Sequence, residues 1–209
     1  MRTRMLVLLV LIASCSKPFP EADSLRLLVF ARAQDWNKYI FITTATHDGN
    51  FAAGFATAIA GADDFCAQQK SSSAPWLPGF SAEYRALLTD GATRRASLTA
   101  DVGDGQTGWV LAPNTTYYRP DGMVLFTTNA VALYNMNTGL RNPFTSDASA
   151  AARWWTGLDL GWETLLTCSS WTSSVANGTR GQGGTTTNAS LSAASNGGGT
   201  PIRLLCVRQ

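Results

Sequence analysis

The sequence has few charged residues and a single histidine. Asp, Glu, Lys and Arg together make up 14% of the 209 residues, and His47 is the one histidine. A Ser-His-Asp triad would depend on this imidazole, which accompanies no nucleophile-elbow motif. Zinc sites usually need several His or Cys ligands, and none cluster here. A phosphate-binding G-x-x-x-x-G-K-S/T loop is also missing. We therefore expect no metal ion, no cofactor and no enzymatic activity.

The N-terminal apolar segment is too short to cross a membrane. Met5–Ala13 has nine residues, whereas a bilayer-spanning helix needs about 20. It follows Arg2 and Arg4 and ends in Ile-Ala-Ser before Cys15, a pattern typical of a secretory signal peptide with a lipobox. We expect a lipoprotein signal peptide over 1–14, and a lipidated Cys15 with a tether over 15–38. The alternative is an ordinary signal peptide followed by an incidental cysteine.

Export changes the charge balance and the state of the cysteines. Without Arg2 and Arg4, the chain has 14 Lys and Arg residues and 14 Asp and Glu residues, so its net charge is about zero. The pI of 8.4 for the full sequence therefore does not indicate a nucleic-acid partner. Three cysteines remain in a compartment that permits disulfides, namely Cys66, Cys168 and Cys206. One pair and one leftover thiol are expected, but the spacing does not choose among the three possible pairs.

The residue pattern predicts one early helix among short strands. Residues 56–70 place Ile59, Ala62 and Cys66 at helical spacing, which predicts about three turns with Cys66 on the buried side. Strands are expected over 39–44, 83–88, 153–160, 168–174 and 202–209, with a hairpin at Asp121-Gly122. Residues 172–201 are rich in Ser, Thr, Gly and Asn, which favours a long surface excursion. We expect one α+β domain over residues 39–209.

Several fragments occur in the order typical of the C-type-lectin-like fold. They are a helix with a cysteine (GADDFC, 61–66), W-x-G-L (155–158), C-x-x-W (168–171) and a terminal strand with a cysteine (LLCV, 204–207). The R-A-L-L strand at 85–88 and the Asp121-Gly122 hairpin add a resemblance to the endostatin branch. With the lipobox, the chain most resembles endostatin-like bacterial surface lipoproteins described from leptospires, which share a domain of unknown function.

The resemblance implies a disulfide framework and the absence of calcium. It pairs Cys66 with Cys206 and leaves Cys168 unpaired, because the segment before the last strand has no cysteine. The loop that a second bond would hold is then expected to be more mobile. Calcium-dependent sugar-binding relatives carry E-P-N or Q-P-D and W-N-D motifs, and neither is present here.

By this resemblance the chain is expected to be an adhesin-like binding protein, exposed on the cell surface and anchored by lipid in the outer membrane. The implied partners are host matrix proteins such as laminin and fibronectin, and complement regulators such as factor H. Two alternatives are a calcium-independent carbohydrate-binding module and an envelope-structural lipoprotein.

Four residues are candidates for ligand binding. Arg94 and Arg95 follow a turn and are expected to be either an exposed basic pair or ordinary surface charge. Alternation along β-structure places Trp154 and Trp155 on opposite faces of their strand. Because the resemblance assigns Trp155 and Trp171 to the core, Trp154 and Trp162 are expected to face outward.

Overall fold

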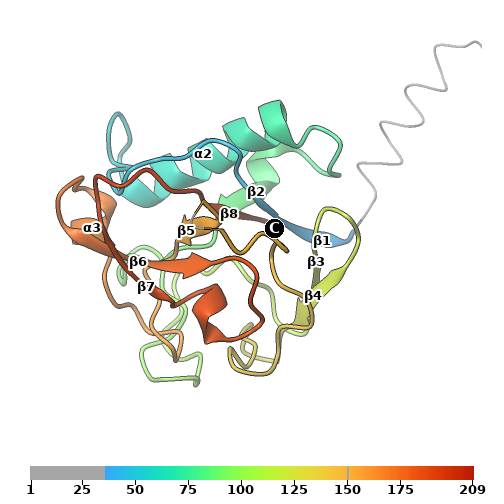
Figure 1. Ribbon diagram of the computed structural model, residues 1–209. Helices are drawn as coiled ribbons and strands as arrows, with labels where there is room; N and C mark the ends of the chain where they lie inside the picture. Colours follow the sequence, from blue (N-terminus) through green and yellow to red (C-terminus); the bar gives the residue numbers. More distant parts are fainter. Residues whose placement is uncertain (1–35, 150) are drawn as a thin grey trace, which may run out of the picture. The chain divides into compact units, whose positions relative to one another are not determined.

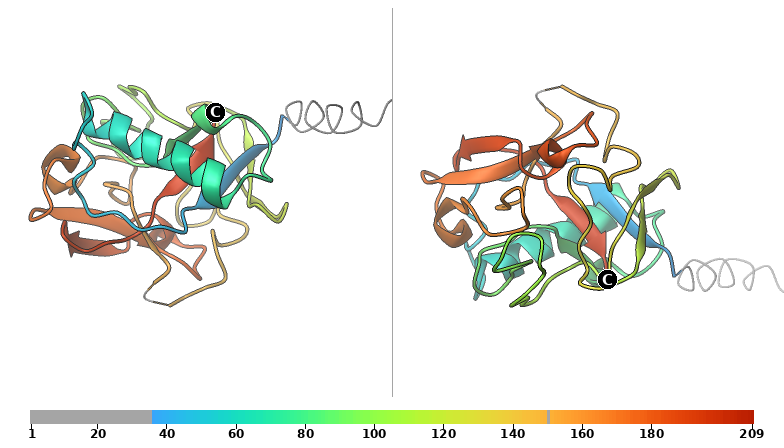
Figure 2. Two further views of the ribbon diagram at one scale, coloured as in Figure 1. Left: turned by 90° about the horizontal axis from the view of Figure 1, so that it is seen from above. Right: turned by 90° about the horizontal axis from the view of Figure 1, so that it is seen from below.

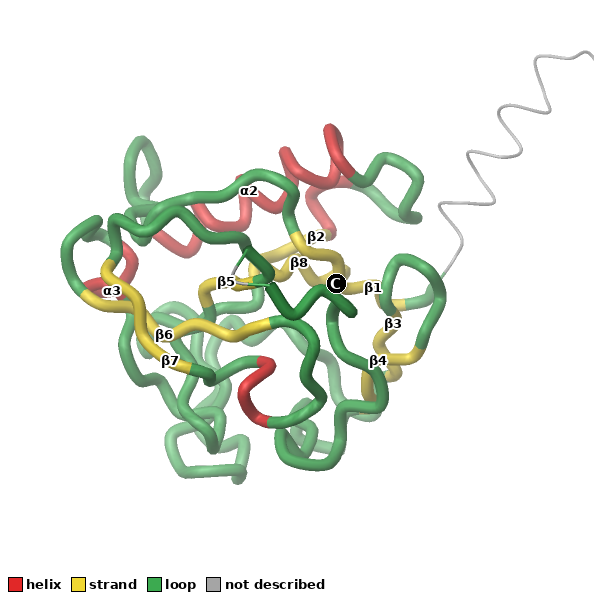
Figure 3. Tube along the Cα trace, viewed as in Figure 1, coloured by secondary structure: helices red, strands yellow, loops and turns green. Residues whose placement is uncertain are grey.

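A computed structural model of the chain describes residues 36–149 and 151–209. The predicted signal peptide, the predicted lipidation site at Cys15 and the tether up to residue 35 lie outside these residues. Within the described part, no helix is long and apolar enough to cross a membrane. Loops make up most of the trace, and the strands are short (Figure 3).

The strands in residues 36–149 and 151–209 form two sheets. The five-stranded sheet has the order β2-β8-β1-β3-β4, and the three-stranded sheet has the order β5-β6-β7 (Figure 1). All pairings are antiparallel except that of β1 with β3. The strands are β1 (Lys38–Ile42), β2 (Tyr84–Ala86), β3 (Thr116–Tyr118), β4 (Val124–Thr127), β5 (Arg153–Trp155), β6 (Asn177–Gln182), β7 (Ala194–Gly197) and β8 (Leu205–Arg208). The predicted hairpin at Asp121-Gly122 is confirmed, since it joins β3 to β4.

One long helix covers a face of the five-stranded sheet (Figure 2). Helix α2 (Ala58–Ser73) begins where the Thr57 side chain accepts a hydrogen bond from the Ala60 amide, which satisfies one of the free N–H groups of the first turn. The other helical segments of the described residues are single turns: α3 (Cys168–Trp171), η1 (Ser81–Glu83) and η2 (Asn188–Ser190). One main helix among short strands is an α+β fold, as predicted.

A disulfide fastens α2 to the sheet. Cys66 is fully buried on the inner side of the helix and is bonded to Cys206 of β8, with 5.6 Å between their Cα atoms. The predicted pairing is confirmed. Strand β8 lies between β2 and β1, so the bond joins the helix to an interior strand of the sheet.

Strand β5 separates two hydrophobic cores. Trp154 packs in one core with Phe126, Leu158 and Trp162, whereas Trp155 packs in the other with Cys66 and Trp171. Burying an indole stabilises the fold by about 2–3 kcal/mol. Each ring also keeps a hydrogen bond, because the Trp154 N–H donates to the Ser190 carbonyl and the Trp155 N–H donates to the His47 carbonyl.

Two predictions for the C-terminal third were wrong. Residues 168–174 do not form a strand, because Cys168 to Trp171 make one turn with φ values between 48° and 61°. Residues 172–201 are not one long surface excursion, because they contain β6 and β7. The glycines of β6 are required by packing, since a Cβ atom on Gly178 would lie 2.6 Å from the Cys168 sulfur. Composition therefore suggested a loop where close contact with other groups requires small residues.

The disulfide should contribute strongly to stability. Because it closes a 140-residue loop, the chain-entropy model gives about 4–5 kcal/mol as an upper value. We expect dithiothreitol to lower the urea midpoint of the wild-type chain clearly. The control is the Cys66→Ala/Cys206→Ala variant, whose lower midpoint should not respond to the reductant. A wild-type midpoint that dithiothreitol leaves unchanged would contradict the prediction.

Candidate functional site

The two tryptophans expected at the surface are fully buried, so that prediction was wrong. Trp154 lies beneath the η2 segment, and its indole N–H donates to the Ser190 carbonyl. Trp162 packs edge-on against Tyr134, with ring centroids 5.0 Å apart, and donates to the Tyr134 carbonyl. Alternation placed Trp154 and Trp155 on opposite faces as expected, but both faces of β5 are covered. Neither Trp154 nor Trp162 can stack on a ligand at the surface.

Arg94 is a structural residue and does not form part of an exposed pair. Its side chain is 2% exposed, and both terminal nitrogens donate to the Asp63 carboxylate at 2.8 Å. Its Nε donates to the Gly108 carbonyl. Such a two-point bond between guanidinium and carboxylate fixes geometry as well as charge. Arg94 thus ties the 90–108 loop to helix α2, which explains its burial.

Arg95 has hydrogen-bond partners of its own and is only partly exposed. Its Nε donates to the Gly105 carbonyl at 2.7 Å, and its Nη1 donates to the Gly91 carbonyl at 3.0 Å. These bonds hold the guanidinium within its own loop. The predicted basic pair therefore does not form, and only Arg95 retains some access to solvent.

Cys168 is unpaired, as predicted, and its thiol is enclosed by backbone. A Cβ atom on Gly49 or on Gly178 would lie within 2.6 Å of the Cys168 sulfur, so the glycines at these two positions leave room for the thiol. Burial, with a smaller effect of the nearby Asp48 charge, raises the pKa of the Cys168 thiol to about 11. At neutral pH the thiol is protonated, and a protonated buried thiol is a poor nucleophile.

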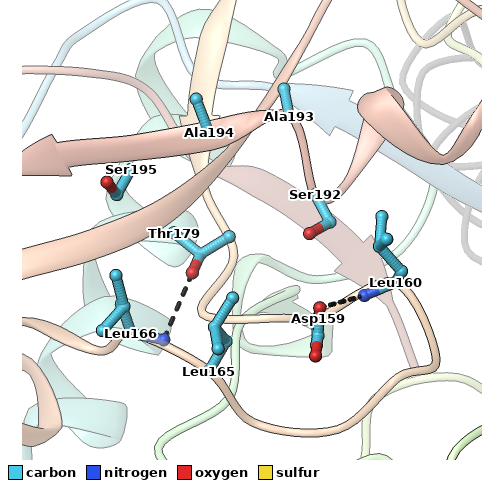
Figure 4. A pocket seen from close by; sticks show the side chains of 9 residues that line it. All are labelled: Asp159, Leu160, Leu165, Leu166, Thr179, Ser192, Ala193, Ala194 and Ser195. Carbon is cyan, nitrogen blue, oxygen red and sulfur yellow. Dashed lines mark hydrogen bonds between the residues drawn. The ribbon is translucent and has the colours of Figure 1, made fainter.

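An open groove lies beside the β6–β7 hairpin and is the candidate functional site (Figure 4). We call it the leucine groove. Its volume is about 290 Å³. It is lined by Asp159, Leu160, Leu165, Leu166, Thr179, Ser192, Ala193, Ala194 and Ser195. Leu160, Leu165 and Leu166 are 51%, 50% and 40% exposed. Such a gathering of exposed leucines differs from the scattered apolar residues of an ordinary surface.

Buried neighbours hold the leucines in place. The Leu165 amide donates to the Gly157 carbonyl at 2.8 Å, and the Leu166 carbonyl accepts from the Thr179 amide at 2.7 Å. The Thr179 hydroxyl also accepts from the Leu166 amide. Trp162, buried between Leu160 and Leu165 in the chain, anchors the middle of the loop. The apolar surface is therefore preformed and costs little ordering on binding.

The groove has a negative end. The Asp159 carboxylate accepts a hydrogen bond from the adjacent Leu160 amide at 2.7 Å and forms no ion pair with a described Lys or Arg. No group of three or more metal-ligating side chains exists in the described part of the chain. The arrangement suits apolar side chains accompanied by a positive charge. Sequence reasoning missed this site, and the adjacent apolar pair Leu165-Leu166 was the one signal in the sequence that could have indicated it.

Comparison with known families identifies the domain. A family model described as "Protein of unknown function (DUF1554)" matches residues 44–189. The chain belongs to the DUF1554 family. No curated protein matches the chain. The DUF1554 match covers α2, β5, β6 and the leucines of the groove, while Cys206 lies beyond its end.

The Arg94–Asp63 bond should support the DUF1554 domain. Removing one partner of a buried ion pair typically costs 3–5 kcal/mol, and the partial exposure of Asp63 reduces the value expected for Arg94→Ala to about 2–3 kcal/mol. The matched Arg95→Ala change should cost less than about 1 kcal/mol. Urea denaturation of both variants measures the difference. Equal losses of stability would show that the buried pair has no special role.

Proposed function

We propose that this chain is a lipid-anchored cell-surface protein that binds another protein through the leucine groove. The observation that carries the proposal is a set of three half-exposed leucines on one loop. Backbone hydrogen bonds to buried residues and the buried Trp162 fix the conformation of this loop. Interfaces concentrate apolar anchors at their centre with polar groups around them. The leucines fit the anchor role, and Asp159 at the groove's end selects a partner with a basic residue beside its apolar side chains.

The proposed partner class follows from the family resemblance. The motifs shared with endostatin-like leptospiral lipoproteins favour adhesin-like binding of laminin, fibronectin or a complement regulator such as factor H. A C-type-lectin-like fold is part of the same proposal. It is supported by the bond between the helix cysteine and the last-strand cysteine, and by the burial of Trp155 and Trp171. Since a fold does not fix a ligand, the groove supplies the residue-level hypothesis.

Anchoring is proposed from the sequence alone. The lipobox ending in Cys15 favours a lipid attached at that residue, with residues 15–38 as the spacer that holds the domain away from the membrane. We place the protein at the outer membrane with the domain facing outward. The envelope-structural alternative uses the same groove with a partner inside the envelope, so the location of the domain separates the two hypotheses.

The carbohydrate alternative loses its predicted platform. Binding a sugar without calcium through tryptophans needs at least two exposed and roughly coplanar rings, but of Trp76, Trp154, Trp162 and Trp171 only Trp76 is exposed. These four tryptophans therefore do not form a sugar-binding platform. This outcome favours a protein partner over a glycan for the leucine groove.

Two charges placed in the groove should weaken binding strongly without unfolding the chain. We expect Leu160→Glu/Leu165→Glu to reduce solid-phase binding to laminin, fibronectin or factor H by at least about tenfold, because the apolar anchor area is lost. The matched control is Leu98→Glu, since Leu98 is also an exposed leucine (57%) and does not line the groove. Both variants should keep the wild-type urea midpoint. Saturable wild-type binding that both variants retain would remove the groove from the proposal.

Protease treatment of intact cells tests the location. We expect externally added protease to digest the wild-type chain before lysis, and radiolabelled fatty acid to be incorporated into the wild-type chain but not into the Cys15→Ser variant. A periplasmic protein serves as the control for cell integrity. Digestion that occurs only after lysis would favour the envelope-structural alternative, and label retained by Cys15→Ser would rule out that residue as the lipid site.

A further inference from the structure

A second hollow lies between helix α2 and the loop that precedes it, and we call it the histidine pocket. It has a volume of about 290 Å³ and shares no lining residue with the leucine groove. The helix contributes Gly61, Asp64, Phe65 and Gln68, whose spacing places them on one face of α2. The loop contributes His47, Asn50, Phe51, Ala53 and Phe55.

Aromatic rings form much of the pocket wall. The His47 ring stacks on Phe51 with centroids 4.3 Å apart and meets the edge of Phe65 at 5.3 Å. Phe55 is 42% exposed. The loop can lie this close to the helix because Gly61 has no side chain, whereas a Cβ there would collide with the Phe51 carbonyl oxygen. The wall is therefore set by backbone packing and exists before any ligand binds.

The polar side of the pocket carries negative charge. Asp64 accepts a hydrogen bond from Gln68 at 2.6 Å and forms no ion pair with a described Lys or Arg. Its neighbour Asp63, in contrast, is neutralised by Arg94. A second carboxylate, Asp48, lies next to the His47 ring, with 3.2 Å between His47 Nδ1 and Asp48 Oδ1. No Lys or Arg lines the pocket.

We propose that the histidine pocket binds an alkylammonium group. Aromatic rings attract a cation by their negative faces, and the unpaired carboxylate of Asp64 supplies the opposite charge and a hydrogen-bond acceptor. The apolar rings accommodate the alkyl chain. A neutral alcohol of the same length lacks the charge, and an anion is repelled by Asp64. The proposal does not rest on the leucine groove, because the two sites have separate residues. The ammonium group belongs either to a free small amine or to a lysine side chain on another protein.

The single histidine gives a direct reporter of the pocket. In the full chain labelled with ¹³C-histidine, the ring signal comes from His47 alone. We expect n-butylammonium chloride to shift this signal saturably, while n-butanol and sodium chloride at matched concentrations do not. Blocked lysine, acetylated at its amine terminus and amidated at its carboxyl terminus, then distinguishes the sources. A similar shift assigns the site to lysine side chains, and no shift assigns it to free amines.

Three variants complete the experiment. Asp64→Asn keeps an acceptor for Gln68 but removes the charge, and it should weaken butylammonium binding by at least about tenfold. Phe55→Ala should also weaken binding, because it removes one ring of the wall. The matched control is Asp101→Asn, an exposed aspartate that does not line the pocket, and it should bind like the wild type. A His47 signal that does not saturate, an equal response to n-butanol, or an unchanged affinity in Asp64→Asn would overturn the proposal.

Discussion

The fold depends on one short strand that places adjacent indoles in two separate cores. Trp154 and Trp155 point to opposite faces of β5, and each is fully buried against a different set of apolar residues. A shift of one residue in the register of β5 would exchange the two rings and disturb both cores at once. The pairing of Trp154 with Gly181 and of Trp155 with Arg180 is therefore fixed from both sides.

The same constraint determines the composition of the neighbouring segments. Gly181 lies directly beside the Trp154 indole and Gly178 lies beside Cys168 and Trp171, so β6 has small residues where most strands have β-branched ones. The turn of Cys168 to Trp171 has a left-handed backbone, which costs about 1–2 kcal/mol per residue. Burial of Cys168 and Trp171, and the hydrogen bond from the Phe51 amide to the Trp171 carbonyl, offset that cost.

Local patterns were predictable from the sequence, and long-range packing was not. The periodicity around Cys66 and the Asp121-Gly122 turn gave α2 and the β3–β4 hairpin correctly, because each depends on nearby residues. The Cys66–Cys206 pairing required the family resemblance. Arg94 was misjudged because Asp63, which pairs with it, is 31 positions away in the chain. β6 was missed because its glycines are explained only by the indoles that they contact.

The two candidate sites were also not predictable from the sequence, because each is assembled by long-range packing. The leucine groove joins the loop after β5 to the β6–β7 hairpin, and no spacing in the sequence places these segments together. The histidine pocket joins a face of α2 other than the buried face that the periodicity indicated to a loop whose approach depends on Gly61.

The disulfide also governs how the domain bears mechanical load. Residues between Cys66 and Cys206 form a covalent loop that contains the whole leucine groove. If a partner binds the groove as proposed and pulls against the N-terminal side of the chain, only the segment before Cys66, which includes β1, can be pulled out without loading the disulfide. That segment, from residue 36 onward, extends to about 100 Å. Beyond this length the force passes through the sulfur–sulfur bond into β8 and the shorter arm of the loop. Under the proposed function, the oxidation state of Cys66 and Cys206 therefore sets how far the domain can extend under load before the force reaches a covalent bond.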